Sequence, residues 1–159
     1  MDLIGRSPIN PFLFYSGKIS GYFTWLIFAL EQTAKYNLGF QDVQLELLNY
    51  LSHAFSGLAL ILVVISLIDL GKSTRLGLPK TETKLKVNGI YKLSRNPMYL
   101  GFDLLTLSSM IYTMNFWIIG LGMYSIFVYH QIIKAEEKFL ENRFGEDYAK
   151  YKSATRRYI

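Results

Sequence analysis

Cysteine is absent from the 159 residues of this sequence, and that absence removes several kinds of chemistry. Disulfide bonds, thiolate metal sites and thiol nucleophiles are excluded, so any catalysis must use other side chains. Cysteine usage therefore carries no information about the redox compartment. The remaining residues show no zinc-ligand spacing, and we predict no metal site.

Charges are missing from long stretches of the chain, which we interpret as membrane-spanning. Residues 47–70 carry no charge between 55 and 68, and as a helix they would rise about 36 Å, more than the roughly 30 Å of a hydrocarbon core. Residues 97–133 contain one acidic residue, Asp103, and at about 55 Å they suit two spans that turn near 113–115. A carboxylate within an apolar span is costly, so Asp103 needs a reason.

The pattern predicts one all-α, multi-pass membrane domain over residues 1–159. The N-terminus lacks the basic start, short apolar core and cleavage site of a secretory signal peptide. Lys18 interrupts the first apolar block, and a lysine near the end of a span can snorkel to the surface. We predict four transmembrane helices at 12–30, 47–70, 97–114 and 116–134, a loop at 71–96 and a tail at 135–159.

Basic residues are concentrated in two segments, which sets the predicted topology. Seven of the 17 lie between Lys72 and Arg95, and seven more lie between Lys134 and Arg157. The positive-inside rule makes both segments cytoplasmic, so an even number of crossings separates them, and both termini are cytoplasmic. Juxtamembrane lysine and arginine follow from topology and anionic lipids, so we predict no nucleic-acid binding.

The stretch 89–101 is a basic, turn-rich entry into an apolar helix. Arg95 brings a fixed charge to the membrane surface. Asn96 suits the N-cap, and Pro97 suits the first helical position, where its missing N–H costs nothing. Tyr99 and Asp103 then lie one helical turn apart on one face. We interpret this stretch as the rim of a site.

The C-terminal third is predicted to be an amphipathic unit. The last span continues into Glu136 and Glu137, for which a surface ion pair with Lys134 is the alternative interpretation. Gly145 is typical of a helix stop, and residues 147–152 predict another short helix with tyrosines suited to the membrane interface.

Together these two segments carry a family signature. The first has the form G-x-Y…R-[HN]-P-x-Y-x-G, and the second has the form E-E-x-x-L…F-G-x-x-Y-x-x-Y…R, ending at Arg156. The pair resembles the isoprenylcysteine carboxyl methyltransferase family and its phospholipid N-methyltransferase relatives. The resemblance covers about residues 60–158.

The resemblance implies an integral membrane enzyme that uses S-adenosylmethionine to methylate a lipophilic acceptor arriving from the bilayer. Carboxylates can bind the donor's positive groups, a helix N-terminus its carboxylate, and aromatic rings its adenine or sulfonium. The implied catalytic residues are Glu137, Arg156 and His130. The implied cofactor-binding residues are Tyr91, Arg95, Asn96, Pro97, Tyr99, Gly101, Glu136 and Glu137.

Two departures leave the acceptor open. Asn96 replaces the histidine frequent in the carboxyl methyltransferases, and residues 130–133 lack an arginine that often precedes the paired glutamates there. His130 is the partial substitute. A carboxylate, an amine and a thiolate therefore all stay open as acceptors. A sterol-type membrane reductase and a non-enzymatic scaffold are the alternative functions, and the oligomeric state is not predicted.

Overall fold

The computed structural model describes residues 7–33, 38–39, 45–71 and 85–159, and the regular elements within these ranges are all helical. The all-α prediction is therefore confirmed for the described residues. Part of the predicted loop at 71–96, residues 72–84, lies outside them. The elements are α1 (Pro11–Glu31), α2 (Glu46–Leu70), the 3-10 helix η2 (Gly89–Lys92), α3 (Pro97–Thr113), α4 (Phe116–Phe144) and α5 (Glu146–Ala154).

The helix limits follow the predicted spans closely, with one difference at the end of α4. This helix continues to Phe144, ten residues beyond the predicted span, because residues 134–144 are mostly good helix formers although they are charged. It stops at Gly145, whose φ of 51° lies in the left-handed region that glycine tolerates. The short helix predicted at 147–152 is present as α5.

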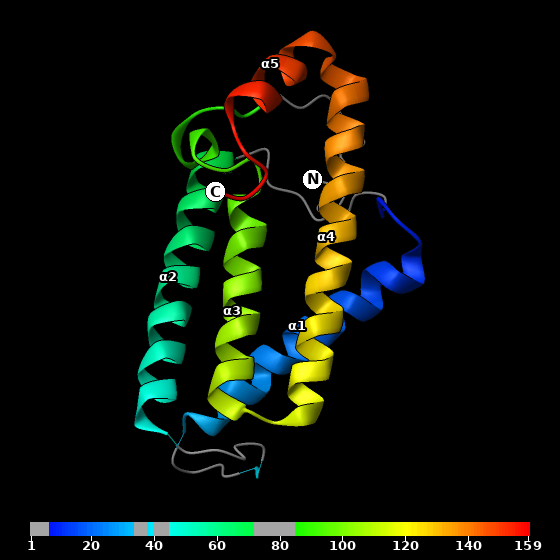
Figure 1. Cartoon of the computed structure of the whole chain (residues 1–159). Coiled ribbons are helices and arrows are strands. Elements are labelled where there is room, and N and C mark those ends of the chain that lie inside the picture. Colours follow the sequence, from blue (N-terminus) through cyan, green and yellow to red (C-terminus); the bar gives the residue numbers. More distant parts are fainter. Residues whose placement is uncertain (1–6, 34–37, 40–44, 72–84) are drawn as a thin grey trace.

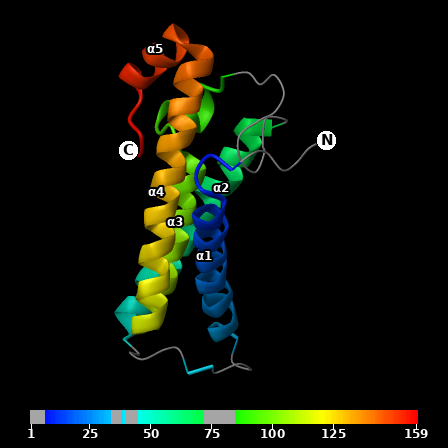
Figure 2. The same cartoon turned by 90° about the vertical axis from the view of Figure 1, so that its right-hand side faces the viewer.

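The four long helices pack beside one another into a bundle. α2 lies against α3, α1 lies against α4, and α3 contacts both α1 and α4. Figure 1 shows the axes of α2, α3 and α4 nearly parallel, with the chain direction of α3 opposite to that of the other two, while α1 crosses them obliquely. Figure 2 shows α1 alongside α4. α5 lies at the same end of the bundle as η2 and the start of α3 (Figure 1).

The turn between α3 and α4 falls where it was predicted, at Met114 and Asn115. Met114 adopts a left-handed conformation with φ of 45°, and its N–H donates to the carbonyl of Met110. The Asn115 side chain accepts hydrogen bonds from the backbone N–H groups of Trp117 and Ile118, which caps α4. The hairpin therefore returns α4 to the end of the bundle at which α3 begins.

The outer surface of the bundle is strongly apolar. α2 and α4 are long and apolar enough to cross a membrane, and few α2 residues are buried inside the protein. Exposed side chains along α2 include Leu47, Ile61 and Ile68. A surface of this kind is unfavourable in water, whereas helices satisfy their own backbone hydrogen bonds within lipid. The protein is therefore membrane-associated.

Candidate active site

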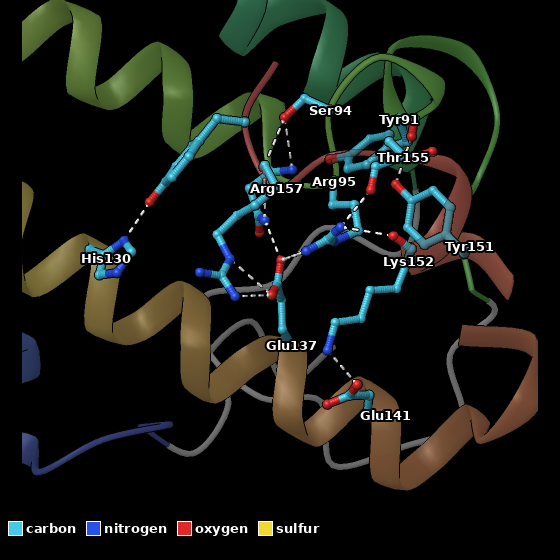
Figure 3. A network of polar contacts seen from close by, with 12 residues as sticks. Tyr91, Ser94, Arg95, His130, Glu137, Glu141, Tyr151, Lys152, Thr155 and Arg157 are labelled. Carbon is cyan, nitrogen blue, oxygen red and sulfur yellow. Dashed lines mark hydrogen bonds and ion pairs between the residues drawn. The ribbon is translucent and has the colours of Figure 1, made fainter. Parts of the chain in front are cut away.

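The centre of the candidate site is a carboxylate, Glu137, in the polar extension of α4. Glu137 is only 4% exposed. Arg95 Nε and Nη2 lie 3.1 and 3.0 Å from its Oε1 atom. Arg157 Nε and Nη2 lie 3.0 and 2.8 Å from its Oε2 atom. Figure 3 shows the two guanidinium groups converging on this carboxylate from different segments. Glu137 therefore pairs with the buried Arg95 side chain and with the partly exposed Arg157, and not with Lys134, the partner that the surface alternative requires.

Arg95 also fastens the C-terminal tail directly. Its Nη1 atom donates hydrogen bonds to the carbonyls of Lys152 and Thr155, and its backbone N–H donates to the carbonyl of Arg156 at 2.9 Å. Its side chain is 7% exposed, so the guanidinium replaces water by these acceptors almost completely. The entry to α3, the end of α4 and the tail thus form one unit (Figure 3).

Asn96 occupies the predicted N-cap position but does not cap the helix with its side chain. Its amide nitrogen instead donates to Glu137 Oε1 at 3.0 Å and to the carbonyl of Arg157 at 3.3 Å. Pro97 follows at the first helical position, as predicted, where no N–H is needed. The Asn96 amide therefore acts as a donor to an ionised carboxylate and to the tail, whereas a helix cap would use its oxygen as an acceptor for backbone N–H groups.

Arg157, which the sequence analysis did not single out, is the tail arginine that contacts Glu137. The side chain of Arg156 is exposed and lies outside the Glu137 cluster, and the catalytic role predicted for it stays a prediction. Hydrogen bonding to Glu137 raises the pKa of the Arg157 guanidinium above its usual value. The two arginines are adjacent, so the family spacing alone did not distinguish them. The backbone is extended at Thr155, just before the two arginines. Consecutive side chains of an extended chain point in opposite directions.

Glu136 points to a different part of the site from its neighbour. The Tyr99 hydroxyl donates to Glu136 Oε1 at 2.9 Å, so the predicted pair from α3 and α4 does meet. The charge of Glu136 also acts on Tyr91 and on Lys18 of α1. Lys18 was expected only to snorkel, and it lies 4.2 Å from the ring centroid of Phe14. Glu136 therefore lies where α1, η2, α3 and α4 approach one another.

Tyr91 connects η2 to the tail. Tyr151 of α5 donates a hydrogen bond from its hydroxyl to the Tyr91 carbonyl at 2.6 Å. Burial, reinforced by the charges of Asp69 and Glu136, raises the pKa of Tyr91 to about 12, so its phenol is neutral at physiological pH. Asp69 Oδ2 accepts a hydrogen bond from the backbone N–H of Ile90 at 2.7 Å, which holds η2 on the end of α2.

The two remaining predicted residues lie away from the Glu137 cluster. His130 Nδ1 is 2.6 Å from the Tyr158 hydroxyl, and the two rings are stacked. Gly101 faces α2, where a Cβ atom would come within 2.9 Å of the Ala59 carbonyl oxygen. Gly101 thus has a packing role in this structure, and its contact with a cofactor stays a prediction.

Comparison with known proteins identifies the family of this chain. A family model described as phospholipid methyltransferase matches residues 48–147, from α2 to α5. The Protein-S-isoprenylcysteine O-methyltransferase of Dictyostelium discoideum is 38% identical over 71 residues, which is 44% of this chain and 30% of that protein. The chain thus matches less than a third of that relative's length, and no solved structure matches it. Because the family model covers more than half of the sequence, this chain belongs to the phospholipid methyltransferase family.

Proposed function

We propose that this protein is a membrane methyltransferase that uses S-adenosylmethionine and acts on a lipophilic acceptor. The observation that carries the proposal is the meeting of the two signature segments, in which Tyr99 donates to Glu136 and Arg95 pairs with Glu137. Residues about 40 positions apart in sequence are thereby held in one polar cluster at the end of an apolar bundle. Family membership and the name of the matched relative support the same chemistry.

The residues at this junction fit the chemical groups of the donor. Glu136 is only partly buried and offers a carboxylate to a sulfonium or an amine, while the nearby Tyr91 and Tyr99 offer aromatic faces. Lys18 supplies a cation for the donor's carboxylate. When bound, S-adenosylmethionine supplies an activated methyl group. The protein's own contribution is then to position donor and acceptor, which is where much of the rate of such a reaction comes from.

Glu136 and Glu137 have different tasks in this proposal. Both oxygens of Glu137 already accept hydrogen bonds from Arg95, Asn96 and Arg157, so this residue holds the tail in place. Within the part of the chain that the structure describes, Glu136 accepts one hydrogen bond, from Tyr99, and has capacity for a ligand. We therefore assign donor contact to Glu136 and positioning to Glu137.

The topology belongs to the same proposal. α1 and α3 pack beside the two apolar helices α2 and α4, and four crossings place the cytoplasmic ends of α3 and α4 together. The basic segments at 72–95 and 134–157 then lie on the cytoplasmic side, as do both termini. A donor from the cytosol reaches the Glu136 region from that side, while a lipophilic acceptor reaches it from the bilayer.

Calorimetric titration of the full chain in a neutral detergent tests this proposal. S-adenosylhomocysteine should bind saturably, whereas reduced nicotinamide dinucleotide phosphate should not bind. Saturable binding of the nicotinamide instead would make the protein a reductase, and binding of neither would make it a scaffold.

A further inference from the structure

Asp69 lies at the end of α2 where an acidic side chain is least favourable. It is the next-to-last residue of the helix, and the last turn contains no basic residue. The carbonyl groups at a helix C-terminus carry a partial negative charge, which repels a carboxylate. An aspartate in this position therefore needs a contact elsewhere that offsets the repulsion.

That contact is with η2. Asp69 Oδ2 accepts a hydrogen bond from the backbone N–H of Ile90 at 2.7 Å, 21 residues further along the chain. The first N–H groups of a helix have no partner within it, and the side chain of the residue just before the helix usually caps them. In η2 the side chain of that residue, Asn88, makes no such bond. Asp69 therefore caps η2 from the end of another helix.

Gly89 allows the carboxylate of Asp69 to approach the backbone this closely. Its φ of 62° lies in the left-handed region, which glycine tolerates. A Cβ atom on Gly89 would lie 2.5 Å from Asp69 Cγ and 2.8 Å from Asp69 Oδ1, so a larger residue would push the carboxylate away. Gly89 is the first residue of the first signature segment, and the contact with Asp69 gives this glycine a specific task in this chain.

The bond between Asp69 and Ile90 begins a continuous series of hydrogen bonds. The Ile90 carbonyl accepts from the N–H of Ser94 at 3.3 Å. Ser94 Oγ accepts from the N–H of Asn96 at 3.1 Å and donates to the carbonyl of Arg157 at 3.2 Å. The turn formed by residues 89–91 is therefore anchored to α2 at its start, and the segment that follows it is joined to the tail.

Tyr91 is held from two elements by this arrangement. It follows Ile90 directly, and its carbonyl accepts a hydrogen bond from the Tyr151 hydroxyl of α5 at 2.6 Å (Figure 3). Tyr91 is buried, and it is one of the residues proposed above to offer an aromatic face to the donor. The direction of its ring depends on the backbone of the turn at 89–91, which Asp69 fixes to α2.

We propose that Asp69 is a positioning residue of the donor site: through Gly89 and Ile90 it holds the turn that carries Tyr91 in the conformation that binds the donor. Asp69 itself does not touch the donor. When only a fraction of the molecules has the binding conformation, the apparent dissociation constant rises by the inverse of that fraction. This inference rests on the proposed methyltransferase function, and it adds to the site a residue that precedes both signature segments.

Calorimetric titration with S-adenosylhomocysteine, on the full chain in maltoside detergent, compares two substitutions of Asp69. Asp69→Ala removes the acceptor, and if the turn then keeps the binding conformation about a tenth of the time, the affinity falls about tenfold. Asp69→Asn keeps an oxygen acceptor in the same place without the charge, so its affinity should stay within about threefold of wild type. Glu46→Ala removes an exposed acid from the first turn of the same helix and should bind as wild type does.

Two results of this titration would overturn the proposal. One is equal affinity of Asp69→Ala and wild type. The other is an Asp69→Asn variant that binds as weakly as Asp69→Ala, because the hydrogen bond to Ile90 would then not be what positions the turn.

Hydrogen exchange of the ligand-free variants shows whether the effect arises at the turn. The Ile90 amide should exchange slowly in wild type and in Asp69→Asn, and about tenfold faster or more in Asp69→Ala. Amides in the middle of α2 and α3 should be unchanged, because they do not depend on this contact. Faster exchange throughout the chain in Asp69→Ala would mean a general loss of stability and would contradict a positioning role.

Gly89→Ala tests the same contact from the other side and keeps the test decisive if Asp69→Ala does not fold. Its Cβ atom would displace the carboxylate, so the affinity for S-adenosylhomocysteine should fall about tenfold, and an unchanged affinity would overturn the proposal. In the double variant there is no carboxylate to displace, so Gly89→Ala should weaken binding less in the Asp69→Ala background than in wild type. Fully additive effects would show that the two residues act independently, which contradicts the proposal.

The outcomes distinguish this proposal from the proposed function. If wild-type protein binds S-adenosylhomocysteine and Asp69→Ala binds it equally well, the positioning role fails and the methyltransferase proposal stands. If wild-type protein does not bind S-adenosylhomocysteine, the methyltransferase proposal fails, and the positioning role fails with it whatever the exchange rate at Ile90.

Discussion

The apolar bundle and the polar end formed by the entry to α3, the end of α4 and the tail are held together by different forces. In the bundle, helices approach at small or neutral groups: Ser108 donates to the carbonyl of Ser52 at 2.7 Å, and Trp25 donates to Thr106. At the polar end, Glu137 binds two guanidinium groups, and the segments it joins lie 20 and 42 residues away in sequence. The stability of the bundle depends on how closely its helices pack, and the stability of the other end depends on ion pairs. A substitution that changes packing should therefore disturb only the bundle, and one that removes a charge should disturb only the other end.

The largest effect is expected from Glu137→Ala. Removing this carboxylate leaves the buried Arg95 side chain without its ion pair, and breaking a buried pair from one side costs about 3–5 kcal/mol. The free energy of unfolding, measured by denaturant titration in detergent, should fall by that amount. Glu146→Ala in the exposed first turn of α5 is the control and should stay within about 0.5 kcal/mol. Equal stability of the two variants would mean that charge does not hold this end.

Gly101→Ala probes the bundle in the same assay. Its Cβ atom would lie 2.7 Å from Val63 Cγ2 and 2.9 Å from the Ala59 carbonyl oxygen, so α2 and α3 must separate. Overpacking of this kind costs about 1–3 kcal/mol. Gly57→Ala in α2 meets no atom within 4 Å and should be neutral or stabilising by up to about 1 kcal/mol. If Gly57→Ala lowers the free energy of unfolding and Gly101→Ala does not, α2 and α3 do not pack closely at Gly101.

Arg157→Ala compared with Arg156→Ala separates two neighbouring residues of the tail. Arg157 makes two hydrogen bonds to Glu137, but its side chain is 34% exposed, so we expect a loss of about 1–2 kcal/mol. Arg156 is exposed outside the cluster, and its removal should change stability by less than about 0.5 kcal/mol. The opposite ranking would mean that Arg156, and not Arg157, holds the tail in place.

Glu136→Gln should have the smallest effect on stability and a clear effect on binding. Glutamine still accepts the Tyr99 hydrogen bond but lacks the charge that a sulfonium or an amine requires. Calorimetry with S-adenosylmethionine, which carries both groups, should show an affinity reduced about tenfold, or about 1.4 kcal/mol, with little change in unfolding. If Glu136→Gln binds the ligand as wild type does, the division of tasks between the two glutamates is wrong.

The same comparison explains what the sequence could and could not predict. Helix existence in the bundle depends on local hydropathy, and so α2 and the turn at Met114 were predicted within about a residue. The charge cluster depends on contacts between distant segments, which no local pattern encodes. The family signature named Glu137, Arg95 and Asn96, which the structure brings into contact. It did not name Arg157, because spacing cannot tell which way an extended tail directs its side chains.

Lys18 and Tyr158 illustrate the same limit. Lys18 was expected only to snorkel because nothing in sequence links α1 to Glu136, yet the bundle brings their charges together. Tyr158 reaches His130 only because the tail folds back after α5. By contrast, the cost of a carboxylate in an apolar span drew attention to Asp103 from the sequence alone. That its Oδ1 atom is buried without a hydrogen-bond partner among the described residues became apparent only in the structure.

The central claim is that the tail, docked on the entry to α3, completes a binding site for a methyl donor. Hydrogen–deuterium exchange of the full chain with and without S-adenosylhomocysteine tests it most directly. The amide of Arg95 bonds to the carbonyl of Arg156, so it should exchange slowly in wild type, faster in Glu137→Ala, and more slowly still when ligand binds. Fast exchange at Arg95 in the free protein, or a ligand that leaves both 89–99 and 145–157 unchanged, would contradict the account.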